Sequence, residues 1–157
     1  MFRFDKLTQK AQEGLQQAQS IAEQTGNQVI HPAHLLIALL QEREGIVSVV
    51  LSKLGIQPAG VLAEAQRVAN GLSKVTGQPP GTYISQPLQA VLEQAFDEAG
   101  HFKDEFVSTE HLLLSLSDSK NDPAGQLLNR AGATHDKAAR IDDQRLRRQQ
   151  RFNLFEP

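Results

Sequence analysis

Two histidines three residues apart, His31 and His34, are the side chains in this sequence best spaced to bind a metal ion. Residues three apart are neighbours on a helix, and imidazoles are common zinc ligands. A zinc site needs further ligands, however, and the similar stretch later in the chain has Ser108 before His111. His34 and His111 each precede leucines in the first turn of a predicted helix. Local packing and hydrogen bonding of these rings is therefore favoured over metal binding, and we expect no metal site.

Three carboxylates, Asp104, Glu105 and Glu110, cluster around the predicted helix start at Ser108. Negative charge is stabilised near a helix N-terminus by roughly 0.3 to 1 kcal/mol per group, which favours a capping role. Paired carboxylates also act as acid and base in glycosidases. The sequence has no tryptophan and one tyrosine to form a sugar platform, so a structural role is favoured over catalysis.

A basic run near the end of the chain is the one candidate for phosphate contacts. Aspartates and glutamines interrupt it, and the formal net charge of the chain is -2, so a solvated surface is favoured over nucleic-acid binding. We expect neither nucleic acid nor membrane as a partner. The arginines of this run are Arg140, Arg145, Arg147, Arg148 and Arg151.

Several classes of chemistry are excluded by what the sequence lacks. It has no cysteine, no Gly-x-x-x-x-Gly-Lys-Ser/Thr phosphate loop and no Gly-x-Ser-x-Gly nucleophile turn. We therefore expect no enzyme and no cofactor. The absence of cysteine fits a reducing compartment, and no run approaches the ~20 apolar residues of a membrane span, so we expect a cytoplasmic protein.

The elements that position these side chains occur twice. His34-Leu35-Leu36 returns as His111-Leu112-Leu113, 77 residues later, and that offset holds without a gap from Leu7/Ile84 through Gly55/Gly132. Two copies are too few for a solenoid, so the repetition predicts one compact domain with pseudo-twofold symmetry. Pairs in register include Thr8/Ser85, Leu15/Leu92, Ala18/Ala95, Ala22/Ala99, Leu39/Leu116 and Leu51/Leu128.

Apolar periodicity and terminal residues predict an all-α fold of eight helices, four in each repeat. Thr8 is suited to cap the first helix and Gly26 to end it in a left-handed conformation. In the first repeat we expect helices at about 9–25, 32–40, 46–54 and 58–72. In the second, they begin after caps at Ser85 and Ser108, after Asp122, and near Thr134.

The domain is expected to span residues 1–139, with repeat 1 at about 7–72, a linker at 73–83 and repeat 2 at about 84–139. The linker contains Pro-Pro-Gly, which cannot continue a helix. At the 77-residue offset Ala65 becomes Asp142 and Leu72 becomes Gln149, so the last helix loses its apolar stripe. Residues 140–157 are therefore predicted to be a divergent charged tail, with 140–151 solvated or frayed.

Three phrases together resemble the amino-terminal domain of the Clp/Hsp100 chaperones, most like the ClpB disaggregase type. They are Phe4-Asp-Lys-Leu-Thr8, His31-Pro-Ala-His-Leu-Leu-Ile-Ala-Leu-Leu40 and Lys103-Asp-Glu-Phe-Val-Ser-Thr-Glu-His-Leu-Leu113. The resemblance covers about residues 1–138. It implies an eight-helix fold of two four-helix repeats, tethered to AAA+ ATPase modules in a ring.

The resemblance also implies a function. In that family the domain engages unfolded or aggregated polypeptide clients and helps to deliver them to the ring. Residues tied to client handling correspond to Thr8, Asp104 and Glu110 here. An apolar groove lies nearby in the family, and the candidates for its floor in this sequence are Val91, Leu92 and Leu112.

This sequence contains no ATPase module. The ring implied by the resemblance would therefore belong either to the same polypeptide (in cis) or to a separate one (in trans). The alternative interpretation is a stand-alone Clp-like accessory subunit that docks on a Clp chaperone or protease, or receives an adaptor. Client identity, oligomeric state and the role of residues 140–157 are left open by the sequence.

Overall fold

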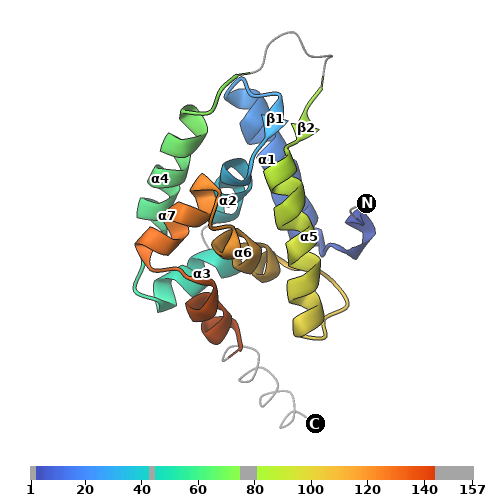
Figure 1. The fold of residues 1–157 in the computed structure, drawn as a ribbon, viewed down its shortest axis with the longest axis vertical. Helices are drawn as coiled ribbons and strands as arrows, with labels where there is room; N and C mark the ends of the chain where they lie inside the picture. The colour runs from blue at the N-terminus through green and yellow to red at the C-terminus, as the bar shows by residue number, and fades with distance from the viewer. Residues whose placement is uncertain (1–2, 43–44, 75–80, 144–157) are drawn as a thin grey trace.

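The computed structural model describes residues 3–42, 45–74 and 81–143 (Figure 1). Within them the fold is almost entirely helical, as predicted. The first repeat contains α1 (Gln9–Gln24), α2 (Pro32–Gln41), α3 (Ile46–Lys53) and α4 (Pro58–Asn70). The second contains α5 (Gln86–His101), α6 (Thr109–Asp118), α7 (Pro123–Ala131) and a helical segment at residues 135–143. A single 3-10 turn, η1 (Phe4–Lys6), precedes α1.

The core is built around α2 and α6, the corresponding helices of the two repeats. Every residue of α2 from Pro32 to Leu40 is buried, and so is every residue of α6 from His111 to Ser117. Helices that are apolar on all sides must be covered on all sides. Helix α1 packs on α2 and α5 on α6, while α4 and α7 contact α2 from other directions (Figure 1). The long helices α1 and α5 are therefore left at the surface with one face outward.

Two short parallel pairings join the repeats, and the sequence did not predict them. Strand β1 (Val29–Ile30) pairs with β2 (Tyr83–Ile84), and an isolated bridge joins Leu7 to Val107. At the 77-residue offset Leu7 corresponds to Ile84 and Ile30 to Val107, so each pairing is the symmetry counterpart of the other. Two-residue strands are too short to show an alternating pattern in the sequence.

The helix ends follow the predicted chemistry. Thr8 Oγ1 accepts a hydrogen bond from Ala11 N at 3.2 Å, and Ser85 Oγ accepts one from Leu88 N at 3.1 Å. Gly26 has a positive φ of 77° after α1, as predicted. Its counterpart Lys103 follows α5 with a φ of 58°, which costs a residue with a Cβ about 1 kcal/mol.

The end of the described chain corrects one prediction. Residues 140–143, expected to be solvated or frayed, continue the helix that starts at residue 135. Ala138 and Asp142 are buried and Ile141 packs against the core, because apolar residues one turn apart still give this helix an inner face. Residues 144–157, with four of the five arginines of the basic run, lie outside the described residues.

His135 joins this last helix to α5. Its Nε2 lies 2.6 Å from Oε1 of Glu98, whose side chain is buried. Burial by itself lowers the pKa of His135, but the hydrogen bond and charge of Glu98 outweigh it, with smaller contributions from Asp136 and Asp118, so the pKa is raised. This contact connects the last helix to the body of the domain.

Candidate functional site

Thr8 and the segment around Asp104 are brought together by the bridge between Leu7 and Val107. Thr8 N donates to Val107 O at 2.9 Å, and Val107 N donates to Lys6 O at 2.8 Å. The start of α1 is therefore fixed beside the loop that leads into α6. Two of the three residues predicted to handle clients lie on this edge of the molecule, and Glu110 follows in the first turn of α6.

Asp104 is held by a buried histidine. Its Oδ2 lies 2.9 Å from Nε2 of His111, whose ring is only 2% exposed, whereas the Asp104 side chain is 41% exposed. His111 Nδ1 accepts from the backbone N–H of Ser108 at 2.9 Å, so the neutral ring carries its proton on Nε2 and donates it to Asp104. The carboxylate therefore keeps a fixed position while one side faces solvent.

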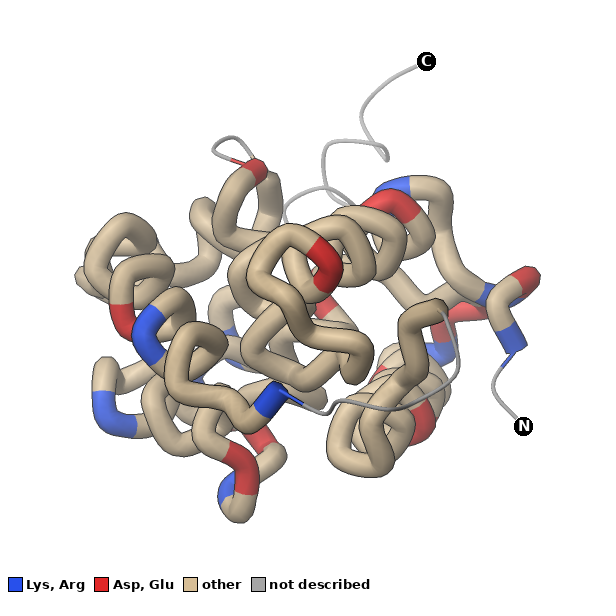
Figure 2. Tube along the Cα trace, turned by 90° about the horizontal axis from the view of Figure 1, so that it is seen from above, with Lys and Arg blue, Asp and Glu red and all other residues tan. Residues whose placement is uncertain are grey.

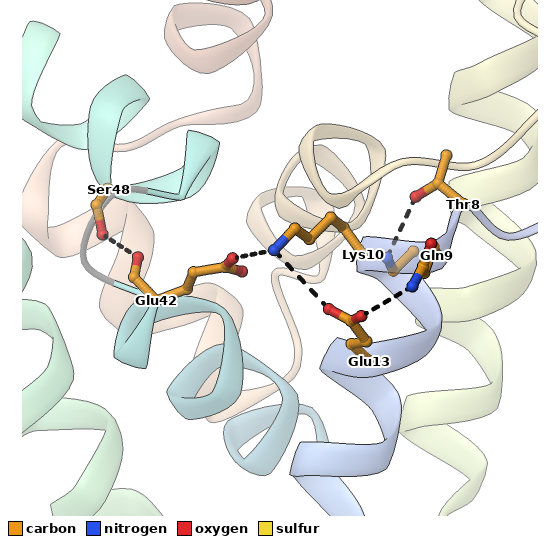
Figure 3. Close-up of polar contacts among 7 residues, drawn as sticks. Thr8, Gln9, Lys10, Glu13, Glu42 and Ser48 are labelled. Carbon is orange, nitrogen blue, oxygen red and sulfur yellow. Dashed lines mark hydrogen bonds and ion pairs between the residues drawn. The ribbon is translucent and has the colours of Figure 1, made fainter.

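Next to the Thr8 cap, a separate network of polar contacts joins the first turns of α1 to the end of α2 (Figure 3). Lys10 Nζ lies 2.8 Å from Oε1 of Glu42 at the end of α2 and 3.8 Å from Oε2 of Glu13. The hydrogen bond and charge of Glu42, together with the charge of Glu13, raise the pKa of Lys10. Because these side chains are well exposed, the contacts orient the surface more than they stabilise it.

Val91, Leu92 and Leu112 all lie in the buried core, on α5 and α6. Leu92 and Leu112 are fully enclosed, so none of the three forms part of an open surface in this conformation. Their place in a client groove stays a prediction, and a client would reach them only if the covering elements moved.

An open apolar groove lies instead where α1 meets strand β2 and the start of α5. Its volume is about 420 Å³, and it runs between strand β2 and the face of α1 that carries Gln12, Gln16 and Gln19. Phe4 and Ile84, which are 50% and 39% exposed, border it. The remaining lining residues are Gln12, Leu15, Gln16, Gln19, Ile30, Thr82 and Leu88.

The groove begins one helical turn from Thr8. The side chain of Gln12 donates to Leu7 O at 3.2 Å, which fixes that glutamine against the start of α1. None of the lining residues carries a charge. Such a groove binds through apolar area and amide hydrogen bonds, with the acidic groups Asp104 and Glu110 lying outside it.

Sequence reasoning missed this groove, although part of its signal was present. Gln12, Gln16 and Gln19 follow one another at helical spacing and form a neutral face on α1. Phe4 precedes the first predicted helix and does not belong to its apolar stripe. Strand β2 forms the opposite side, and it straddles the predicted boundary between the linker, which ends at Tyr83, and repeat 2, which begins at Ile84.

A second cleft of about 530 Å³ lies between α2, α3 and α4. Its lining includes Val49, Ser52, Lys53 and Leu62, and it contains none of the predicted client residues. We consider the groove beside α1 to be the candidate site because it adjoins Thr8 and carries strongly exposed apolar side chains.

The histidine pair of the first repeat is used for local structure. His34 Nδ1 accepts from His31 N at 2.9 Å, which confirms the predicted local hydrogen bonding of the ring. Burial, aided by the nearby His31, lowers the pKa of His34 to about 4. Among the described residues, no three His, Cys, Asp or Glu side chains lie close enough to hold a metal ion.

Within the described ranges, no single helix is both long and apolar enough to cross a membrane; α3 and α4 reach that length only together, across a 115° bend. Lysines and arginines are spread over several elements with acidic residues among them (Figure 2).

Comparisons with known proteins agree with this architecture. Residues 6–131 match the family described as the Clp repeat (R) N-terminal domain. The chain is 38% identical to the chaperone protein ClpB of Corynebacterium efficiens over 130 residues, which are 82% of this chain and 15% of that protein. It is 39% identical to ClpB of Mycobacterium tuberculosis over 127 residues, with 81% and 15% covered. The chain thus spans about 15% of the length of these relatives.

Solved structures share the fold at lower identity. The Hsp104 N-terminal domain of Candida albicans superposes with a TM-score of 0.74 at 19% identity, covering 87% of this chain and 88% of that one. A ClpV N-domain in complex with a VipB peptide gives a TM-score of 0.66 at 17% identity, with 84% and 81% covered. The family match, the ClpB relatives and the paired repeats agree, and the chain belongs to the Clp N-terminal domain family.

Proposed function

We propose that this chain is the client-binding domain of a ClpB-type chaperone, which engages unfolded or aggregated polypeptide for an AAA+ ring in cis or in trans. The similarity to ClpB proteins supports this assignment. The ring, the clients and a cytoplasmic location are parts of the same proposal. Since this chain corresponds to the amino-terminal domain of those relatives, it acts by binding and performs no ATP hydrolysis itself.

The observation that carries the proposal is the open apolar groove bordered by Phe4 and Ile84. Exposed apolar side chains that gather around a groove mark interaction sites, whereas single exposed apolar residues do not. A ClpV N-domain of the same fold was solved with a peptide, which supports peptide binding as a use of the fold.

Binding to such a groove is expected to be weak. A client that buries ~400 Å² of apolar surface gains about 10 kcal/mol. Association costs about 4 to 15 kcal/mol in lost freedom, so little affinity remains per domain. Several domains tethered to one ring would add avidity while each contact still releases its client quickly.

The acidic residues near the groove add a preference for charge. Asp104 and Glu110 lie on the edge of the domain next to Thr8, and they favour client segments that mix apolar and basic residues. Asp104 and Glu110 are therefore proposed to select clients by charge and Thr8 to contribute a polar contact beside them, while the groove supplies the apolar contact. Val91, Leu92 and Leu112 would contribute only through a movement that uncovers them.

Fluorescence anisotropy with a labelled unfolded segment of apolar and basic residues tests the proposal. A Phe4→Ala, Ile84→Ser double variant should bind at least tenfold more weakly, and a Thr8, Asp104, Glu110 triple alanine variant about threefold more weakly at low salt. Phe106→Ala is the matched control, because Phe106 is similarly exposed but lies outside the groove. Wild-type affinity in a correctly folded double variant would contradict the proposal.

A further inference from the structure

The backbone of Ile84 faces away from the strand that β2 pairs with. Tyr83 N donates to Gln28 O at 2.7 Å, and Ser85 N donates to Ile30 O at 3.0 Å. In a parallel pair, successive residues of one strand turn their N–H and C=O groups to opposite sides. Because residues 83 and 85 face β1, the N–H and C=O of Ile84 face the opposite edge.

The symmetry counterpart of Ile84 uses these same groups internally. Leu7 N donates to Phe4 O at 3.1 Å within η1, and Leu7 O accepts from the side chain of Gln12 at 3.2 Å. Both partners come from the same repeat as Leu7. The N–H and C=O of Leu7 are therefore both satisfied by neighbouring residues of the same half, while Val107 bonds to Lys6 O and Thr8 N on either side of Leu7.

The second repeat lacks both of these internal partners. Gly81 stands where Phe4 stands, and residues 81–83 do not form a 3-10 turn. Gln89 corresponds to Gln12, but its amide donates to Glu93 at 3.4 Å along α5. Within the described part of the chain, Ile84 thus presents an N–H and a C=O without hydrogen-bond partners at a strand edge.

The side chain of Ile84 lines the apolar groove, and so does Thr82 two residues earlier. A strand edge with one free donor and one free acceptor, next to an apolar hollow, matches an extended polypeptide in both main chain and side chain. The absence of charge from the lining favours a segment that is itself uncharged over the residues in contact.

The geometry points to strand addition as the mode of binding: an extended, uncharged apolar segment of an unfolded chain adds to β2 as a third strand, hydrogen-bonded to Ile84, with an apolar side chain in the groove. This inference rests on the proposed function and specifies how the same site recognises its client. Main-chain recognition does not depend on sequence, which suits a receptor for many unfolded chains.

Backbone methylation of the peptide tests the inference without changing the protein. The probe is a labelled eight-residue peptide of threonine and serine with a single leucine that fixes its register. In variants of this probe, one residue at a time carries an N-methyl group, which removes its N–H. Methylation at the residue that donates to Ile84 should lower affinity about tenfold, whereas methylation of either neighbour, whose N–H points away, should change it less than twofold.

Amide hydrogen exchange gives a second readout in the protein. Saturating peptide should slow exchange at Ile84 N–H at least tenfold. The amides of Tyr83 and Ser85 are internal controls, because they already donate to Gln28 O and Ile30 O and should change little.

The two proposals fail in different ways. If methylation has no position-dependent effect and Ile84 exchange is unchanged, while the Phe4→Ala, Ile84→Ser variant still loses binding, strand addition is wrong and the groove binds clients in another conformation, such as a helix. If that variant binds the probe like the wild type, both the groove assignment and strand addition are overturned.

Discussion

The groove beside α1 and its symmetry counterpart in the other half are built from corresponding backbone segments. They differ in the side chains that fill them. Ile84 is 39% exposed at the groove, whereas Leu7, its counterpart, is 3% exposed. Gln19 of the groove is replaced by Phe96, which packs against the core, and half-buried Leu15 is replaced by fully buried Leu92. The same duplicated frame thus holds one filled site and one open site, and the open one is the candidate for binding.

The histidines that cap α2 and α6 differ in the same way. Both accept a backbone hydrogen bond at Nδ1. Nε2 of His111 then donates to Asp104, whereas Nε2 of His34 has no hydrogen-bond partner among the described residues. Asn27 stands at the position of Asp104, but it accepts from Thr25 instead. In the second repeat, Nε2 of the buried histidine is therefore paired with the partly exposed Asp104. In the first repeat, Nε2 of His34 is buried without a partner among the described residues.

The substitution with the largest expected effect tests how closely α7 approaches the end of α6 in the second repeat. A Cβ at Gly125 would lie 2.0 Å from the backbone oxygen of Ser119, which cannot move aside easily. Gly125→Ala should therefore lower the free energy of unfolding by about 3 kcal/mol or more. Its counterpart Ser48 already carries a side chain, so Ser48→Ala should cost less than about 1 kcal/mol. Urea unfolding of both variants measures the difference, and equal costs would show that the repeats pack α3 and α7 alike.

Protonation of His34 should have the next largest effect. Burial holds the pKa of His34 near 4, below its value in the unfolded chain. Between these two values the unfolded state binds more protons than the folded state, so stability falls as the pH falls. The wild type should lose about 2 to 3 kcal/mol of stability between pH 6.5 and 4 through this group. His34→Gln, which retains an acceptor for the cap, should lose much less over that range. Urea unfolding as a function of pH checks this, and parallel curves for the two proteins would contradict it.

A smaller effect is expected from removing the partner of His111. Asp104→Ala leaves the buried Nε2–H of His111 without its acceptor. His111 is then unpaired at Nε2, as His34 is in the first repeat. Because Asp104 is partly exposed, water compensates in part, and we expect a loss of about 1 kcal/mol. Asp104→Asn keeps an acceptor and serves as the matched control. Thermal unfolding of both variants would exclude a structural role for the pair if neither differs from wild type.

Most of the architecture followed from the sequence because its signals are local or repeated. The caps Thr8 and Ser85, the turn at Gly26 and the leucine-rich phrases each fix a helix boundary or an inner face. The 77-residue offset then gives the symmetry. The last helix was predicted too short, because Asp142 interrupts the apolar stripe in the sequence although its side chain is buried in the fold.

The candidate site was harder to predict, because it depends on how distant segments meet. Thr8 and Asp104 adjoin only through the pairing of Leu7 with Val107. Val91 and Leu92 have the apolar character of a groove floor, but burial in the core accounts for that character equally well. The open groove combines Phe4, a neutral face of α1 and strand β2, and no single segment of sequence shows this combination.

The two reciprocal pairings have a consequence for the origin of the fold. Each pairing joins a segment of one repeat to a segment of the other, so a single repeat can make neither pairing within itself. A polypeptide with a single repeat would satisfy both edges only as a symmetric homodimer with two identical contacts. The domain therefore has the form of a dimer joined into one chain, in which the two corresponding surfaces do not have to be identical.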